Sequence, residues 1–217
     1  MRSGEFAVGS QNGNPSASGV ISAANEYHGC SRQLTWILLC LTTESIPKEQ
    51  VKNMSVGTLE ELLVDELKDL YSAEKQIVRA LPKIIKAVST PELQHGLSNH
   101  LEETKGQVVR LEKIGEILGK KMTGKTCVGM KGVLEEGSEV LEDTDKGVVR
   151  DAALISACQR VEHYEMAGYG SARDFAKQLG QSEIASLLDE TLEEEKNADK
   201  TLTGASKQVN AQAQEEG

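Results

Sequence analysis

The sequence is poor in cysteine, and its cysteines are not spaced for zinc binding. The four cysteines, Cys30, Cys40, Cys127 and Cys158, form neither a CxxC pair nor any other zinc-site pattern. This spacing argues against a cysteine-ligated zinc site and predicts reduced thiols in a cytosolic chain. We expect Cys158 to be a small residue of the core.

Apolar runs long enough to cross a membrane are absent as well. The apolar run of the N-terminal part, residues 34–41, has eight residues, whereas a membrane-spanning helix needs about 20. The run also lies too far from the N-terminus, without a basic segment before it, to form a convincing signal peptide. We therefore expect a cytoplasmic protein that does not span a membrane.

Basic clusters are few, and the chain carries a net charge of -10. An acidic chain of this kind argues against a nucleic-acid partner. The first 53 residues hold four acids and four bases, so the whole net charge belongs to residues 54–217. The two parts of the chain therefore differ chemically.

The N-terminal part has the composition of a disordered segment. Residues 1–33 are rich in Gly, Ser and Asn without any hydrophobic period, so they cannot bury enough apolar area to offset chain entropy. The first six residues resemble translated cloning sites, and Met54 resembles a natural start. We expect three parts: a disordered leader from cloning or upstream translation at residues 1–53, one helical domain at residues 54–204, and a flexible tail at residues 205–217.

Two long helices are predicted in the first half of the domain. Residues 58–61, Thr-Leu-Glu-Glu, form a capping box that starts the first helix. The seam of this helix, meaning the heptad positions that face other helices, is apolar except at Glu74. Thr90 and Pro91 start a second helix after a short turn. Its seam carries three successive polar residues, which are His100, Thr104 and Gln107.

The second half predicts a long crossover followed by two more helices. Residues 120–147 are dotted with glycine and fit only a short helix, at residues 133–141. A third helix is expected over about residues 148–179, and Ser182 caps a fourth. Two tight hairpins joined by one long connection predict an all-α, ferritin-like four-helix bundle rather than a simple up-and-down bundle.

Both hairpins carry acidic residues at the same level. Residues equally far from an antiparallel turn face each other, because both helices rise about 1.5 Å per residue. Glu74 lies 16 residues before the first turn, and Glu103 and Gln107 lie 13 and 17 residues after it. Glu165 and Glu195 each lie 15 residues from the second turn. The sequence therefore predicts a group of acids near mid-height in the bundle.

The acids differ in how firmly the pattern places them. Glu74 and Glu165 are each the lone acid of an apolar heptad seam, and Glu162 shares a face with Glu165. Within the run at residues 193–195, either Glu194 or Glu195 faces inward. For any single acid, the alternative is a chance position in helices that are rich in glutamate.

Three further polar residues have several interpretations. Glu103 lies beside the seam rather than on it. Gln107 and His100 are metal ligands, hydrogen-bonding partners behind the ligands, or polar core residues.

Hard divalent cations favour several oxygen donors, and cations would offset the cost of burying like charges together. The group therefore predicts a dinuclear iron or manganese site.

Four segments carry a family resemblance, in order and at the expected spacings. They are residues 69–76 (DLYSAEKQ), 100–107, 161–165 (VEHYE) and 192–199. In these segments the chain resembles the YciE/YciF family of bacterial ferritin-like stress proteins, over about residues 54–202. The resemblance implies a ferritin-like fold, a dinuclear metal site, dimers and a role in stress.

The resemblance also implies a set of site residues. The implied metal ligands are Glu74, Glu103, Glu162, Glu165, Glu195 and Gln107, with His100 and Asp199 close behind them. The chain departs from the Glu-x-x-His motif of other di-iron bundles, because Gly106 and Ala198 stand where histidine is expected. We therefore expect a carboxylate-rich site for two divalent ions, with iron favoured and manganese as the alternative.

Two functions from different classes are open. The first is a stress-response protein for metal handling or redox chemistry, as a ferroxidase- or peroxidase-like oxidoreductase. The second is a non-catalytic structural or interaction module, in which the polar positions only fix the register of the bundle. Apolar residues outside the seams, at Ile85, Val109 and Ile117, also predict a homodimer.

Overall fold

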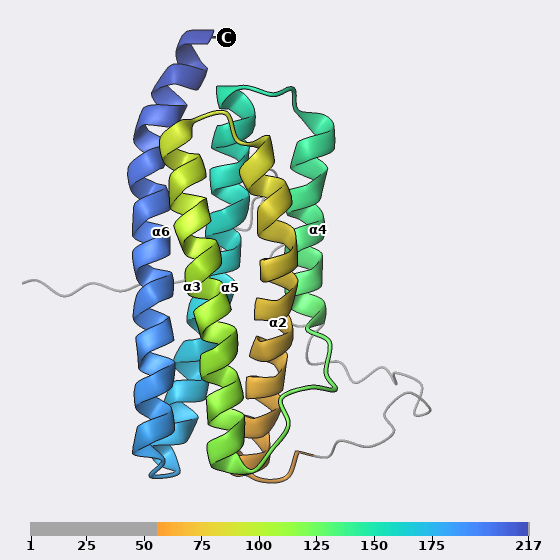
Figure 1. Cartoon of the computed structure of the whole chain (residues 1–217), viewed down its shortest axis with the longest axis vertical. Helices are drawn as coiled ribbons and strands as arrows, with labels where there is room; N and C mark the ends of the chain where they lie inside the picture. The colour runs from red at the N-terminus through yellow and green to blue at the C-terminus, as the bar shows by residue number, and fades with distance from the viewer. Residues whose placement is uncertain (1–55, 217) are drawn as a thin grey trace, which may run out of the picture. The chain divides into compact units, whose positions relative to one another are not determined.

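The computed structural model describes residues 56–216, and the predicted leader, residues 1–53, lies outside them. The helices are α2 (Leu59–Ala87), α3 (Pro91–Leu118), α4 (Val128–Asp143), α5 (Val148–Gln178) and α6 (Ser182–Glu216). Helices α2 and α3 form one antiparallel hairpin, α5 and α6 form the other, and α4 lies in the connection between them (Figure 1). The predicted all-α, ferritin-like bundle of two hairpins and a long crossover is confirmed.

Local signals set the ends of the helices. The capping box of α2 is formed, because Thr58 Oγ1 accepts from Glu61 N at 3.2 Å and Glu61 Oε2 accepts from Thr58 N at 3.2 Å. Gly119 ends α3 and Gly180 follows α5, with φ angles of 62° and 71° in the left-handed region that favours glycine. None of the helices within residues 56–216 has an apolar stretch long enough to cross a lipid bilayer.

The crossover helix is longer than the predicted residues 133–141. Helix α4 begins at Val128, because the side chain of Cys127 caps it. The prediction of a shorter helix rested on the positions of the glycines, which do not indicate this cap. Cys127 Sγ accepts from Met130 N at 3.3 Å, and Cys127 N donates to Ser72 Oγ of α2 at 2.9 Å. The start of α4 is thereby tied to the bundle.

Most of the segment that the sequence predicted as a flexible tail, residues 205–217, belongs to helix α6. Helix α6 continues to Glu216 and extends past the neighbouring helix ends (Figure 1). Val209 lies one heptad after Leu202, is 1 % exposed and belongs to the same apolar cluster. The seam therefore runs on through Gly204, which does not end the helix.

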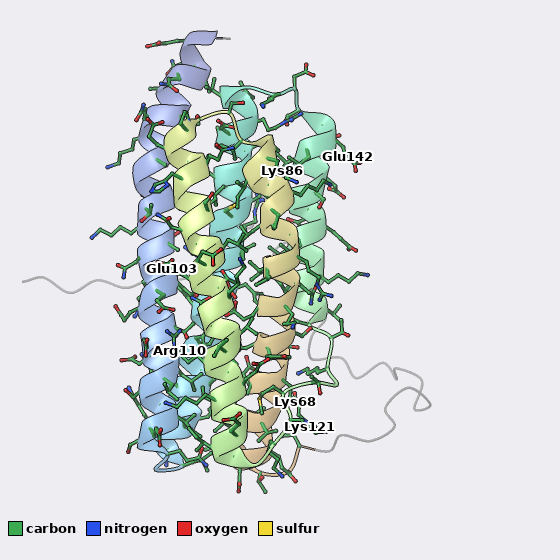
Figure 2. All side chains as sticks on the ribbon, viewed as in Figure 1. Lys68, Lys86, Glu103, Arg110, Lys121 and Glu142 are labelled. Atoms are coloured by element: carbon green, nitrogen blue, oxygen red, sulfur yellow. The ribbon has the colours of Figure 1, made fainter. Side chains whose placement is uncertain are left out.

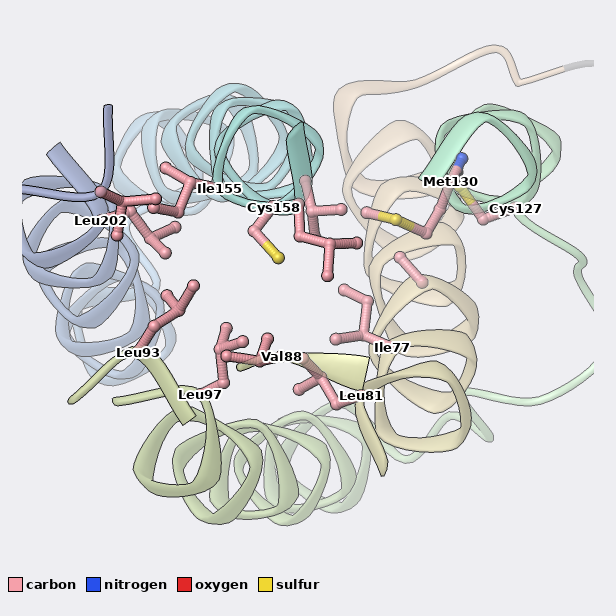
Figure 3. Packing of buried hydrophobic residues seen from close by; sticks show 14 residues of the cluster. Ile77, Leu81, Val88, Leu93, Leu97, Cys127, Met130, Ile155, Cys158 and Leu202 are labelled. Carbon is pink, nitrogen blue, oxygen red and sulfur yellow. Dashed lines mark hydrogen bonds between the residues drawn. The ribbon is translucent and has the colours of Figure 1, made fainter. Parts of the chain in front are cut away.

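The bundle has two apolar clusters rather than one continuous core. One cluster packs the end of the bundle where α2 ends and α3 begins (Figure 3), and α4 covers its side. The other packs the opposite end, near the turn between α5 and α6. Representative members of the first are Ile77, Leu97, Leu154, Cys158 and Leu202, and of the second Leu67, Leu111, Tyr169, Ala172 and Leu188.

The apolar residues proposed for a dimer contact differ in exposure. Val109 and Ile117 are exposed on α3, whereas Ile85 is partly buried against the first cluster. Ile85 is therefore part of the fold of one chain. The homodimer stays a prediction, as do the cytoplasmic location and the lack of a nucleic-acid partner.

A buried acid from α5 fastens the turn between α2 and α3. Both oxygens of Asp151 accept from Ser89 N, at 2.9 and 3.1 Å, and Oδ2 also accepts from Thr90 N at 2.7 Å. The sequence predicted that the Thr90 side chain caps α3, but no such hydrogen bond forms. The Thr90 hydroxyl instead donates to Asp151 Oδ2 at 2.6 Å. The contact fixes the height of the first hairpin against the second.

We predict that Asp151→Ala lowers the free energy of unfolding by about 3 kcal/mol, because it leaves two backbone donors and one hydroxyl without a charged acceptor. The matched control is Asp145→Ala, at an exposed acid shortly before α5, which should change stability by less than about 0.5 kcal/mol. Urea unfolding followed by circular dichroism measures both. Equal midpoints for the two variants would contradict the prediction.

Candidate metal centre

A layer of buried polar side chains crosses the bundle between the two apolar clusters. Every bundle helix contributes, because each places a polar residue where its heptad otherwise places an apolar one. We call the group the polar layer. Its members are Glu74 from α2, His100, Thr104 and Gln107 from α3, Glu162 and Glu165 from α5, and Glu195 from α6.

Many polar atoms of this layer have no hydrogen-bond partner. Within residues 56–216, eight buried side-chain nitrogen or oxygen atoms have none, and seven of them belong to the polar layer. These seven are Glu74 Oε2, both ring nitrogens of His100, Gln107 Oε1, Glu162 Oε2, Glu165 Oε1 and Glu195 Oε2. An unsatisfied buried polar atom costs about 1–3 kcal/mol, so a metal ion that accepted these atoms as ligands could offset the cost.

Burial disfavours the charged forms of the four glutamates in the layer. Burial raises the pKa of Glu74, Glu162 and Glu165 well above the usual range, and the charge of a neighbouring glutamate raises each pKa further. Burial also raises the pKa of Glu195. Without a cation, the layer therefore holds protons at pH values where free glutamate has lost them.

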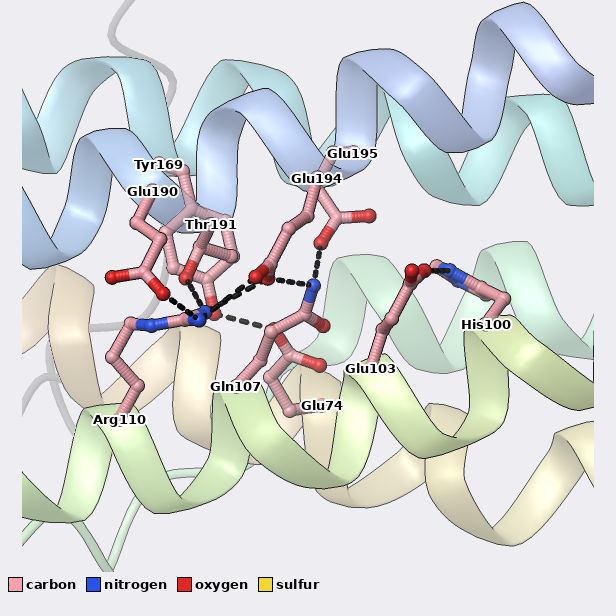
Figure 4. A network of polar contacts seen from close by, with 10 residues as sticks. All are labelled: Glu74, His100, Glu103, Gln107, Arg110, Tyr169, Glu190, Thr191, Glu194 and Glu195. Atoms are coloured by element: carbon pink, nitrogen blue, oxygen red, sulfur yellow. Dashed lines mark hydrogen bonds and ion pairs between the residues drawn. The ribbon is translucent and has the colours of Figure 1, made fainter.

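A cationic side chain pairs with the rim of the layer, as Figure 4 shows. Arg110 donates to Glu194 at 2.8 Å and to Thr191 at 2.7 Å. The Gln107 amide donates to both Glu194, at 3.0 Å, and Glu195. Glu194 thus lies at the rim with Arg110, whereas Glu195 is fully buried, so Glu195 is the inward member of the pair.

His100 connects the layer with the surface. Its Nε2 lies 3.4 Å from Glu162 Oε1, and its Nδ1 lies 3.7 Å from Glu103 Oε2. His100, Glu162 and Glu195 each offer a ligand atom, and these atoms lie within 4.8 Å of one another. The three residues could hold a metal ion, which favours the interpretation of His100 as a ligand.

Two residues implied for the site lie outside the layer. The Glu103 side chain is 52 % exposed and reaches the layer only through His100 (Figures 2 and 4). Asp199 accepts from Gln159 Nε2 at 2.9 Å and lies 3.4 Å from Nε2 of exposed His163, so it is bound to the outer face of α5. Both residues are off the seams of their helices, which explains why the structure does not bring them in.

Sequence reasoning missed one residue that contacts the layer and one that pairs with its rim. The hydroxyl of buried Tyr169 donates to Glu74 Oε1, and Arg110 pairs with the rim. The heptad seam that contains Glu165 continues three residues later at Gly168, so it does not point to Tyr169. A Cβ on Gly168 would lie 2.8 Å from Leu70 Cδ2, so the glycine lets α5 approach α2 closely. The signal for Arg110 was its position three residues after Gln107, on the same helix face.

Comparisons with known proteins agree with this fold. The model of a family described as "Domain of unknown function (DUF892)" matches residues 58–215. Protein YciF of Escherichia coli (strain K12) is 48 % identical over 151 residues, which are 69 % of this chain and 91 % of that protein. The crystal structure of the E. coli stress protein YciF matches with a TM-score of 0.70 and 46 % identity, covering 72 % of this chain and 99 % of that one. YcfI from Rhodopseudomonas palustris matches with a TM-score of 0.67 and 40 % identity, covering 70 % and 97 %.

We predict that the polar layer makes the metal-free protein less stable as the pH rises. A glutamate whose pKa is raised by folding binds more protons in the folded state than in the unfolded state, between its two pKa values. The free energy of unfolding therefore falls as the pH rises through that window, from the usual value of about 4.5 upward.

Thermal melts in chelator, at pH values from about 5 to 8, test this sign. Glu165→Gln removes one titrating group at nearly constant shape, so the variant should lose less stability over this range than the unaltered protein. Identical pH slopes for the two proteins would show that Glu165 does not titrate as its burial demands.

Proposed function

The chain belongs to the DUF892 family and is a relative of the E. coli stress protein YciF, and from this premise we propose that it is a ferritin-like stress-response protein that binds two divalent metal ions in its polar layer. The observation that carries the proposal is the set of seven unpartnered buried atoms, counted within residues 56–216. They come from all four bundle helices and meet at one level.

The donors of the layer fit two cations. The charges of neighbouring glutamates raise the pKa values of Glu74, Glu162 and Glu165, so the four carboxylates of the layer lie close together. Two divalent ions carry four positive charges, which equal the four negative charges that burial otherwise suppresses. Cations therefore resolve the electrostatic conflict of the layer without protons.

The donor types favour iron(II) or manganese(II). Four carboxylates and the Gln107 amide oxygen are hard oxygen donors, and His100 adds one imidazole. Iron is our first choice because the His100 ring lies with Glu162 and Glu195. Manganese is the alternative because a single histidine is few for an iron site.

The protein's own residues orient and shield the donors. Tyr169 holds one oxygen of Glu74, and Gln107 holds one oxygen of Glu195, which leaves the other oxygen of each carboxylate directed into the layer. The two apolar clusters exclude water on either side. Ions bound there would supply electron transfer to oxygen or peroxide, so the function is metal handling or redox protection under stress.

We predict about two divalent ions per chain in protein purified without chelator, by elemental analysis. Glu165→Ala should lower this content and abolish the metal-dependent rise in melting temperature, because a ligand that binds only the folded state stabilises it by mass action. In chelator, Glu165→Gln should raise the stability of the metal-free protein by about 1 kcal/mol or more, through relief of buried charge.

The matched control is Glu142→Ala, at an exposed glutamate of α4 that lies away from the polar layer (Figure 2). It should leave both metal content and melting temperature unchanged. If alanine at Glu74, Glu165 and Glu195 also leaves the metal content unchanged, the dinuclear site is wrong. The structural module, in which the layer only fixes register, is then the better account.

A further inference from the structure

Two cavities reach the His100–Glu162 pair from different sides of the bundle. The first, of about 190 Å³, lies between α3 and α6, and we call it the α3–α6 crevice. The second, of about 110 Å³, lies between α2, α4 and α5, and we call it the apolar cavity. Both are lined by His100 and Glu162 at their inner ends, so both join the polar layer to the outside.

The two cavities differ in charge. The α3–α6 crevice is lined by the exposed acids Glu92 and Glu103 and by the amide side chains of Asn99 and Asn197, and no lysine or arginine of the described chain lines it. The apolar cavity is lined mainly by aliphatic side chains, and the bases Arg79 and Lys83 are part of its lining. Cations are therefore attracted to the crevice and repelled from the apolar cavity.

His100 is placed to pass a cation inward. Its ring is buried between the exposed acid Glu103, at 3.7 Å, and the buried acid Glu162, at 3.4 Å. Within residues 56–216 neither ring nitrogen has a hydrogen-bond partner, although the ring lines the crevice. Figure 4 shows Glu103 and His100 beside each other on α3, with Gln107 further along the helix.

We propose that the α3–α6 crevice is the uptake route for divalent cations, in which Glu103 captures the ion and His100 passes it to Glu162. This inference rests on the proposed metal-binding function. It gives Glu103 a role in the rate of loading, whereas the buried glutamates determine how much metal is held. The cation exchanges water ligands for oxygen and nitrogen ligands along the route, without any covalent or redox step.

Two variants test the route in the full chain. Glu103→Gln removes the capturing charge without changing the shape of the side chain. Gly96→Leu narrows the crevice, because a Cβ on Gly96 lies within 4 Å of no described atom beyond its chain neighbours and its own helix backbone, so the longer side chain has open space to fill. Leucine also has a higher helix propensity than glycine, so α3 is not weakened.

Each variant has a matched control on the same helix. Glu102→Gln removes an equal charge from the neighbouring exposed glutamate, which pairs with Lys105 and does not line the crevice. Gly106→Leu adds the same side chain at an exposed glycine outside the crevice, where the surroundings of an added Cβ are equally open. The controls separate the route from general effects of charge and helix propensity.

The measurement is stopped-flow absorbance of Co²⁺ binding to chelator-treated protein, with stoichiometry from a separate equilibrium titration. Glu103→Gln and Gly96→Leu should each slow loading by about tenfold or more while leaving the stoichiometry unchanged. Both controls should load at the rate of the unaltered protein. Glu103→Gln should also weaken the dependence of the rate on ionic strength, because the steering charge is lost.

Three outcomes would overturn the uptake route. One is that both test variants load Co²⁺ at the rate of the unaltered protein and with the same stoichiometry. That result would leave the metal site itself intact. Another is equal slowing of test and control variants. The third is slow loading of Ala80→Leu, which narrows the apolar cavity, together with normal loading of Gly96→Leu. Failure of the unaltered protein to bind Co²⁺ at all would instead count against the proposed function, and the route would fall with it.

Discussion

The strongest constraint on the structure is the burial of four glutamates in one layer between two apolar clusters; they are Glu74, Glu162, Glu165 and Glu195. Burying one carboxylate costs several kcal/mol, and burying several together adds mutual repulsion. A chain selected only for stability would place leucine or isoleucine at these seam positions. The apolar clusters on either side must therefore be large enough to keep the bundle folded in spite of its own centre.

The rest of the fold serves to keep these donors at one level. The capping box at Thr58 and the left-handed glycines fix where the helices begin and end, so the hairpins cannot slip by a residue without misplacing a carboxylate. Asp151 ties the turn of the first hairpin to α5 of the second. Gly168 brings α5 close to α2, and its neighbour Tyr169 can then donate to Glu74.

Heptad periodicity predicted the fold and most of the buried polar layer. A seam position must face another helix whatever the partner is, so Glu74, Glu165 and Gln107 could be placed without a structure. Periodicity could not decide between Glu194 and Glu195, because the phase of a helix is uncertain by one residue near a run of identical side chains. The answer came from Arg110, which draws Glu194 to the rim.

Contacts between helices that are far apart in sequence could not be predicted in this way. The clasp made by Asp151 joins residues about 60 positions apart, and no local pattern encodes it. The start of α4 depends on a thiol cap at Cys127, and the continuation of α6 depends on Val209 packing against the first cluster. Glu103 was assigned to the site from its level in the first hairpin and from the family resemblance, and neither distinguishes a buried donor from an exposed neighbour.

The position of the Arg110 side chain distinguishes between two interpretations of the layer, a metal site and a polar layer that only fixes the register of the bundle. A polar layer that only sets register is most stable when its charges are balanced within the protein. In this chain Arg110 is bound by Glu190 and Glu194 at the rim, and Glu194 also accepts a hydrogen bond from the neutral amide of Gln107 in the layer. The four inner carboxylates have no lysine or arginine partner among the described residues. The protein thus keeps the positive charge of Arg110 outside the layer. The negative charge of the ionised carboxylates in the layer is left for a metal ion to balance.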